Sequence, residues 1–225
     1  MAPNPNPLMS LKSSIKTVLT LGRGVAGGLP EAAEHADPIE LFEAWFDAAR
    51  ESGILLPDSA ALATATPEGI PSARMVLLKG VDSRGFVFYT NYGSQKAREL
   101  DANPHAALCL HWAVLQRQVR VSGRVERIGE EESAAYFATR TKGSQIGAWA
   151  SRQSEPLGNR KELEERAREV AARFTEGDVP LPTFWGGYRL DPTRIEFWQG
   201  RADRLHDRLA FVRDGQGWTT QRLQP

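Results

Sequence analysis

Five strand-like segments in quick succession constrain the fold of this chain more than any other feature. They occupy residues 59–66, 73–79, 85–91, 106–114 and 117–128. Turn sequences such as PEG and VDSRG, or one short helical segment over residues 94–101, separate them. Strands this close together favour an antiparallel sheet, because parallel neighbours need long crossover connections. We expect the sheet to close into a barrel, since closure removes exposed edge strands.

Helices and further strands complete the expected fold. Asp37 and Pro38 suit the start of a helix whose apolar residues recur at helical spacing as far as Gly53. Helical patterns return over residues 130–140 and 159–174, and strand patterns over residues 188–200, 203–213 and 218–223. The sequence therefore predicts an α+β fold built on an antiparallel barrel with flanking helices.

The first 36 residues differ from the rest of the chain. They open with alternating Asn and Pro and continue into a glycine-rich run. A segment of this composition buries little apolar surface, so we expect a poorly ordered extension over residues 1–36. The remaining residues, 37–225, are enough for a single domain with a substantial core.

Charge balance and cysteine content narrow the possible partners. The 28 basic and 28 acidic residues give a formal net charge of zero, so we expect neither nucleic acid nor an anionic membrane as a partner. No apolar run approaches the roughly 18 residues of a membrane span. The single cysteine, Cys109, cannot form an internal disulfide, and the four histidines lack the spacing of metal ligands. We therefore expect a cytoplasmic protein without a metal site.

Two groups in the middle of the chain are candidates for anion binding. Arg74 and Lys79 flank an apolar strand segment, and strand alternation places them on opposite faces. Tyr136 and Arg140 lie four residues apart on one face of an expected helix, and Ser144 follows in an expected turn. Two hydroxyls and a guanidinium suit a phosphate. The alternative is a solvated helix end with ordinary surface charge.

A third cationic group lies in the segment WQGRADRLHDR, residues 198–208. If the segment is a strand, alternation places Arg204, His206 and Arg208 on one face. Trp198 adds an aromatic plane, and the combination suits a flat, anionic, heteroaromatic ligand. The alternative is an edge strand whose charges block pairing with another sheet.

Several longer motifs occur in a fixed order along the chain. They are RMVLLK at 74–79, FYTN at 88–91, SQK at 94–96, RQV at 117–119 and SQIGAWAS at 144–151, followed by QSEPL, VPLPTFWGGYRL, IEFWQG and RLHDR. From about Asp37 to the C-terminus, this order resembles the pyridoxine (pyridoxamine) 5′-phosphate oxidase family. The resemblance implies a split-barrel flavoprotein that forms a homodimer and binds FMN at the subunit interface. It also implies a step of vitamin B6 salvage, in which O2 oxidises pyridoxine 5′-phosphate or pyridoxamine 5′-phosphate to pyridoxal 5′-phosphate. The products would include H2O2 and, from the amine, NH3.

The resemblance assigns roles to individual residues. The residues that resemble the FMN-binding set are Arg74, Met75, Val76, Leu77, Leu78, Lys79, Tyr89, Thr90, Lys96, Gln118, Gln153, Ser154, Trp198 and Arg208. Those that resemble the grip on the substrate phosphate are Lys79, Tyr136, Arg140 and Ser144. Arg204 and His206 resemble the pair that covers the pyridine ring of the substrate and orients the carbon that loses hydride.

The sequence departs from the family pattern at two places. Members typically carry an Arg-x-x-Tyr near the N-terminus that closes over the substrate, whereas residues 1–36 contain no Tyr. Many members have SRK where this chain has SQK, so Gln95 replaces an arginine beside the FMN phosphate. An amide loses a charge-assisted contact there, and we expect weaker FMN binding than in those members.

Two other functions stay open at this point. The FMN oxidases of phenazine biosynthesis share the barrel, the SQK variant and a similar RLH segment, although we expect them to lack the substrate-phosphate residues that are present here. A non-catalytic split-barrel protein that binds flavin or pyridoxal phosphate is the second alternative. Such a carrier would not need the pair formed by Arg204 and His206.

Overall fold

A computed structural model describes residue 29 and residues 31–225 of the chain. The helices are α2 (Pro38–Glu51), α3 (Gln95–Ala102), α4 (Glu130–Ala138), α5 (Lys142–Ala150) and α6 (Arg160–Arg173), with short 3-10 turns η1 (Glu31–His35), η2 (Ala113–Leu115) and η3 (Ala202–Arg204). The strands are β1 (Ser59–Ala65), β2 (Pro71–Asp82), β3 (Gly85–Asn91), β4 (His105–Trp112), β5 (Arg117–Arg127), β6 (Trp185–Gln199), β7 (Asp207–Asp214) and β8 (Gly217–Leu223).

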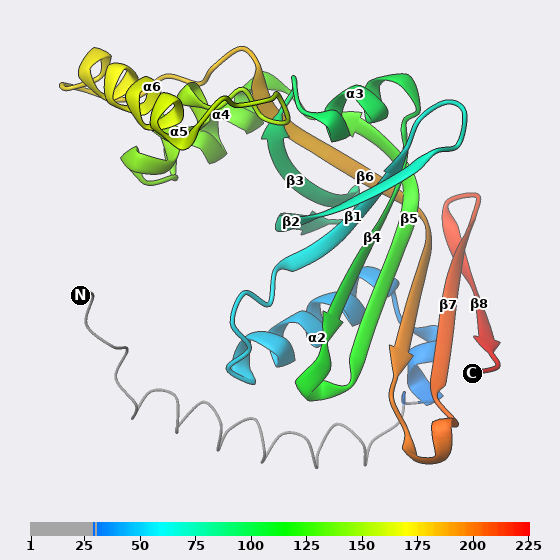
Figure 1. Ribbon diagram of the computed structural model, residues 1–225. Helices are drawn as coiled ribbons and strands as arrows, with labels where there is room; N and C mark the ends of the chain where they lie inside the picture. Colours follow the sequence, from blue (N-terminus) through cyan, green and yellow to red (C-terminus); the bar gives the residue numbers. More distant parts are fainter. Residues whose placement is uncertain (1–28, 30) are drawn as a thin grey trace.

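The strands form a closed antiparallel barrel. They are hydrogen-bonded in the order β3-β2-β1-β4-β5-β6, and β3 also pairs with β6, which closes the ring. β7 and β8 extend the sheet beyond β6 as a hairpin (Figure 1). Alternate residues of the strands point into the barrel, and Leu108, Leu110, Val119 and Val121 are fully buried there. The predicted α+β barrel with flanking helices is confirmed.

Helix α2 covers one end of the barrel with its apolar face. The Phe42 ring lies 4.9 Å from the Phe86 ring, and the Trp45 ring lies 5.2 Å from the Phe197 ring. The helix begins as the sequence predicts, because the Asp37 carboxylate accepts a hydrogen bond of 2.7 Å from the backbone N–H of Ile39. Burial of each large apolar side chain stabilises such a core by about 1.5–3 kcal/mol.

Helices α4, α5 and α6 gather at the other end of the barrel, in the upper left of Figure 1. A second, smaller hydrophobic cluster joins them to the start of β6 through Phe137, Val179 and Trp185. The expected turn at Ser144 is wrong, because this residue lies in the first turn of α5. Thr141 caps that helix by accepting a hydrogen bond from the backbone N–H of Ser144.

Two other segments differ from the expectation. The strand predicted from residue 203 begins only at Asp207, because Asp203 and Arg204 adopt left-handed backbone conformations (φ 56° and 59°) within the turn η3. Near the N-terminus, Leu29 and Ala33 are buried, so packing starts before Asp37. Residues 1–28 and 30 of the expected extension lie outside the described residues, and with them most of the segment in which the family's Arg-x-x-Tyr is missing. No helix in the described part of the chain is long and apolar enough to cross a membrane.

Candidate functional site

A cavity of about 440 Å³ lies between β2, β3 and the helices α4 and α5. We call it the basic cavity, because Lys79 and Arg140 both line it. The predicted site residues that it brings together are Leu77, Lys79, Tyr89, Thr90, Tyr136, Arg140, Ser144 and Gln153. The expected convergence of Tyr136, Arg140 and Ser144 is therefore present in the structure.

Stacked aromatic rings form one wall of the basic cavity. The Tyr89 ring lies 3.9 Å from the Tyr136 ring and 5.4 Å from the Trp185 ring, with interplanar angles of 15° and 8°. The Arg140 guanidinium lies 4.8 Å from the centre of the Trp185 ring. Burial, with a smaller contribution from the charge of Glu132, raises the pKa of Tyr89 to about 12, so its hydroxyl stays protonated at neutral pH. The wall is therefore flat, uncharged and able to donate hydrogen bonds.

One nitrogen of the Arg140 side chain lacks a hydrogen-bond acceptor among the described residues. Its Nη1 is the one buried side-chain nitrogen or oxygen without a hydrogen-bond partner in the described part of the chain. Burial lowers the pKa of Arg140, but a guanidinium stays charged at any physiological pH. A buried cationic donor without an acceptor is unfavourable. Arg140 also lines the basic cavity, so an anion bound there would meet its guanidinium.

The positive charge of Lys79 is partly neutralised by an aspartate that the sequence pattern did not indicate. Its Nζ lies 2.6 Å from Oδ2 of Asp58, which precedes β1. The predicted division of this strand between two faces is confirmed, because Lys79 and Leu77 line the basic cavity while Leu78 is buried in the core. Met75, on the same face as Leu77, is 62% exposed. Nothing in the sequence pattern pointed to Asp58, since a lone aspartate before a strand is ordinary.

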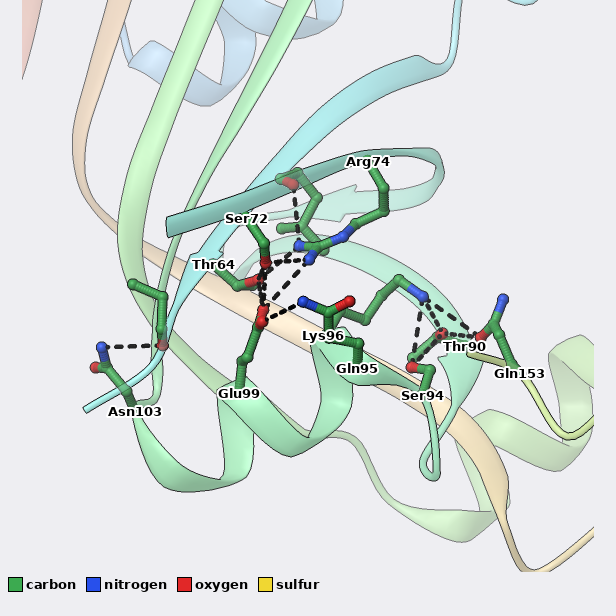
Figure 2. A network of polar contacts seen from close by, with 12 residues as sticks. Thr64, Ser72, Arg74, Thr90, Ser94, Gln95, Lys96, Glu99, Asn103 and Gln153 are labelled. Carbon is green, nitrogen blue, oxygen red and sulfur yellow. Dashed lines mark hydrogen bonds and ion pairs between the residues drawn. The ribbon is translucent and has the colours of Figure 1, made fainter. Parts of the chain in front are cut away.

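Lys96 forms a second cationic centre beside the basic cavity (Figure 2). Its buried Nζ lies 3.2 Å from Thr90 Oγ1, 3.4 Å from Ser94 Oγ and 3.4 Å from Gln153 Oε1. All three partners are neutral oxygens. Burial and the nearby charge of Arg74 lower the pKa of Lys96 to about 8, although Glu99 acts in the opposite direction. An anion beside Lys96 would stabilise its protonated form.

Arg74 lies in the same network and is already bound by other groups (Figure 2). Its Nη1 donates to Thr64 Oγ1 and to the Leu62 carbonyl, while its Nη2 donates to Ser72 Oγ and to Glu99 Oε2 at 3.2 Å. Burial would raise the pKa of Glu99, but hydrogen bonds from Ser72, Thr64 and Gln95 and the charge of Arg74 outweigh it and lower the pKa to about 2. The network thus contains a carboxylate that stays ionised at neutral pH and that no sequence motif indicated.

The remaining predicted residues form a separate C-terminal group: Gln118, Trp198, Arg204, His206 and Arg208. The His206 ring lies 4.7 Å from the Trp198 ring, and His206 Nδ1 accepts a hydrogen bond of 3.2 Å from the backbone N–H of Arg201. Arg208 is paired with Glu196 at 2.7 Å, and Arg204 is exposed. The predicted common face of Arg204, His206 and Arg208 is wrong, because only Arg208 belongs to a strand.

One chain does not bring the C-terminal group to the basic cavity. Trp185, which lines the cavity, is the first residue of β6, and Trp198 is the last but one. The strand has 15 residues, so its ends are separated by up to about 45 Å at roughly 3.3 Å per residue. Ser154 does not line the basic cavity and instead lines a smaller one with Arg152 and Leu157.

Comparison with known proteins identifies the family. Residues 46–174 match the family described as pyridoxamine 5′-phosphate oxidase. The chain belongs to the pyridoxamine 5′-phosphate oxidase family. Residues 185–225 match a second region, described as the pyridoxine 5′-phosphate oxidase C-terminal dimerisation region. The C-terminal group, apart from Gln118, lies within that second region.

Relatives in the pyridoxamine 5′-phosphate oxidase family are similar over most of the chain. The pyridoxine/pyridoxamine 5′-phosphate oxidase of Rubrobacter xylanophilus is 60% identical over 88% of this chain and 91% of its own. That of Psychromonas ingrahamii is 54% identical over 96% of this chain and 100% of its own. Among solved structures, PhzG from Burkholderia lata 383, in complex with tetrahydrophenazine-1-carboxylic acid, superposes with a TM-score of 0.85. It is 35% identical and covers 90% of this chain and 100% of its own.

Proposed function

We propose that this chain is an FMN-dependent oxidase that converts pyridoxine 5′-phosphate and pyridoxamine 5′-phosphate to pyridoxal 5′-phosphate. The observation that carries the proposal is that Arg140, whose buried Nη1 has no hydrogen-bond partner among the described residues, lines the basic cavity. Tyr136, Ser144 and Lys79 line the same cavity and add two hydroxyls and an ammonium. This donor set suits a phosphate, which offers several oxygens to several donors at once.

The second cationic centre, around Lys96, suits the phosphate of FMN. Arg74 and Lys96 supply the cations. The atoms that hydrogen-bond to Lys96 Nζ are neutral oxygens, so none of them neutralises its charge. In this proposal the backbone of residues 75–78, together with Tyr89, Thr90 and Gln153, surrounds the rest of the cofactor. Bound there, FMN would supply the redox chemistry, a hydride transfer from the substrate carbon with O2 as the final acceptor and H2O2 as the product.

The C-terminal group would act on the basic cavity of a partner subunit. A homodimer brings together residues that one chain separates along β6, and each of its two equivalent sites then contains both groups. Gln118, Trp198 and Arg208 of one subunit would contact FMN, and Arg204 and His206 would hold the substrate ring against the flavin. His206 Nδ1 accepts a hydrogen bond from the backbone N–H of Arg201, so the Nε2 side of the ring would face the substrate. The match of residues 185–225 to a dimerisation region supports this arrangement.

The likeness to PhzG keeps a phenazine-type oxidase as the second candidate. An unpartnered arginine could bind a carboxylate as well as a phosphate. The convergence of Lys79, Tyr136, Arg140 and Ser144 favours the phosphate, because a phosphate monoester brings three oxygens and nearly two negative charges to two cations and two hydroxyls, whereas a carboxylate brings one charge.

The visible spectrum and oxygen uptake of the purified protein test the proposal. We expect a yellow protein that consumes O2 when pyridoxine 5′-phosphate is added and does not respond to unphosphorylated pyridoxine at the same concentration. A yellow protein without turnover would favour the phenazine-type oxidase or a carrier. A colourless protein that binds no added FMN would contradict the proposal.

A further inference from the structure

Glu99 is a buried carboxylate next to the two cations that would bind the FMN phosphate (Figure 2). It lies on α3, and its side chain is 8% exposed. Its Oε2 accepts hydrogen bonds from Thr64, from Ser72 at 2.6 Å and from Arg74 at 3.2 Å. Gln95, one helical turn earlier, donates to its Oε1 at 2.8 Å. The carboxylate is therefore fixed on both oxygens.

These contacts take up the terminal nitrogens of Arg74. A guanidinium has two N–H bonds on each terminal nitrogen. Those of Nη1 point to Leu62 O and Thr64 Oγ1, and those of Nη2 point to Ser72 Oγ and Glu99 Oε2. A phosphate that approaches Arg74 must share or replace these acceptors. Only Glu99 among them carries a charge, so it is the acceptor that competes most strongly with the phosphate.

The same carboxylate reduces the local charge. Arg74 and Lys96 carry two positive charges, and Glu99 carries one negative charge beside them, so the network has one net positive charge for a phosphate of nearly two negative charges. Low exposure limits screening by water and salt, which makes this opposing charge effective over several ångströms.

We propose that Glu99 is an internal competitor for the cofactor phosphate and thereby sets how strongly this chain prefers FMN to riboflavin. The inference rests on the proposed function, in which Arg74 and Lys96 hold the FMN phosphate. Gln95 takes part by holding the carboxylate in place, since its amide donates to the oxygen that faces away from Arg74. The chain thus combines a neutral residue at position 95 with an acidic residue at position 99 at its phosphate site.

A purely structural role for Glu99 makes the opposite prediction. If its main effect were to orient Arg74, its loss would weaken FMN binding. However, three neutral acceptors still hold the guanidinium when the carboxylate is gone: Leu62 O, Thr64 Oγ1 and Ser72 Oγ. If its main effect were to keep the barrel folded, its loss would change the affinities for FMN and riboflavin by the same factor.

Titration of the apoprotein with FMN and with riboflavin separates these roles. Flavin fluorescence quenching is measured for wild type, for Glu99→Gln, and for Glu176→Gln as a matched change at an exposed position. The titrations are run at about pH 6.5, well below the pKa of about 8 that Lys96 has in the wild-type chain, because loss of the Glu99 charge lowers this pKa further. We expect Glu99→Gln to lower the Kd for FMN about tenfold and to leave that for riboflavin within about twofold. The control should match wild type for both flavins.

The outcomes are distinct from those that test the proposed function. Unchanged or weaker FMN binding by Glu99→Gln, or an equal change for riboflavin, would overturn the role of Glu99 while leaving the oxidase intact. Wild-type protein that binds no FMN would overturn the proposed function itself and this inference with it. If Glu99→Gln does not fold, Glu99→Asp replaces it, because the shorter side chain withdraws the carboxylate from Arg74 without adding a positive charge at the phosphate site. We expect it also to tighten FMN selectively, and equal tightening of riboflavin would count against the proposal.

Discussion

Arg140 is the residue whose environment most directly indicates a phosphorylated substrate. Its buried Nη1 lacks a partner among residues 29 and 31–225, so we expect the substrate to provide one. We expect Arg140→Met to raise the KM for pyridoxine 5′-phosphate by about 10- to 100-fold, the range for loss of a charged hydrogen bond. FMN affinity should stay close to that of wild type, because Arg140 lies outside the network around Lys96. A KM unchanged within twofold in steady-state oxygen uptake would contradict this role.

Lys96 should make FMN binding depend on pH. Burial and Arg74 lower its pKa to about 8, so the free protein loses this charge as the pH rises above 8. Below that value the lysine is protonated and attracts the phosphate. FMN affinity should therefore fall between about pH 7.5 and 9.5, and riboflavin affinity should not. In Lys96→Met the FMN affinity should be lower throughout and lack this decline; an identical decline in the variant would assign the pH dependence to another group.

Individual site residues were predictable from the sequence to different degrees. Helical spacing identified Tyr136 and Arg140, and the SQK motif identified Lys96. The structure places the first two at the basic cavity and Lys96 in contact with Thr90 and Gln153, which line the same cavity. The motifs did not identify Asp58 or Glu99, which adjust the charge of predicted cations. Both are acidic residues in unremarkable local sequence, and only the fold shows that they face Lys79 and Arg74.

At the scale of elements, the contact between β5 and β6 tolerates little change. The register shifts between Ser122 and Gly123, where Gly123 lies against the backbone of Asp191. A Cβ at this position would overlap the Asp191 carbonyl oxygen, a backbone atom that cannot move aside. We expect Gly123→Ala to lower the free energy of unfolding by about 2–4 kcal/mol. Gly129→Ala is the control, because a Cβ there meets no atom within 4 Å. Equal denaturant midpoints for the two variants would contradict the expectation.

The sequence predicted the elements better than their ends. Strands β1 to β5 and helix α2 follow simple alternation or helical spacing and were found where expected. Helix α5 was missed because Gly143 and Gly147 lower helix propensity, although Thr141 is a suitable N-cap. The start of β7 was predicted four residues too early, because alternation alone cannot reveal the left-handed turn at Asp203 and Arg204.

At the scale of the whole molecule, β6 separates the two halves of the proposed site. The strand begins at the basic cavity and ends at the C-terminal group. The two halves therefore form one site only in a dimer, where each site takes one half from each subunit. The family resemblance in the sequence named both halves and implied a homodimer. It could not show which residues share one chain's cavity, since that depends on the path of β6 through the barrel.

The central claim is that each active site combines the basic cavity of one subunit with the C-terminal group of the other. At a substrate concentration well below the raised KM of Arg140→Met, this variant and Arg204→Ala should each lose most of their oxygen uptake, because each removes one half of both sites. A dimer with one chain of each kind has one site with both changes and one intact site. Oxygen uptake by the two variants after they are unfolded and refolded together in equal amounts measures this directly. Random pairing predicts recovery of about a quarter of wild-type activity, and activity no greater than that of the separately refolded variants would contradict the claim.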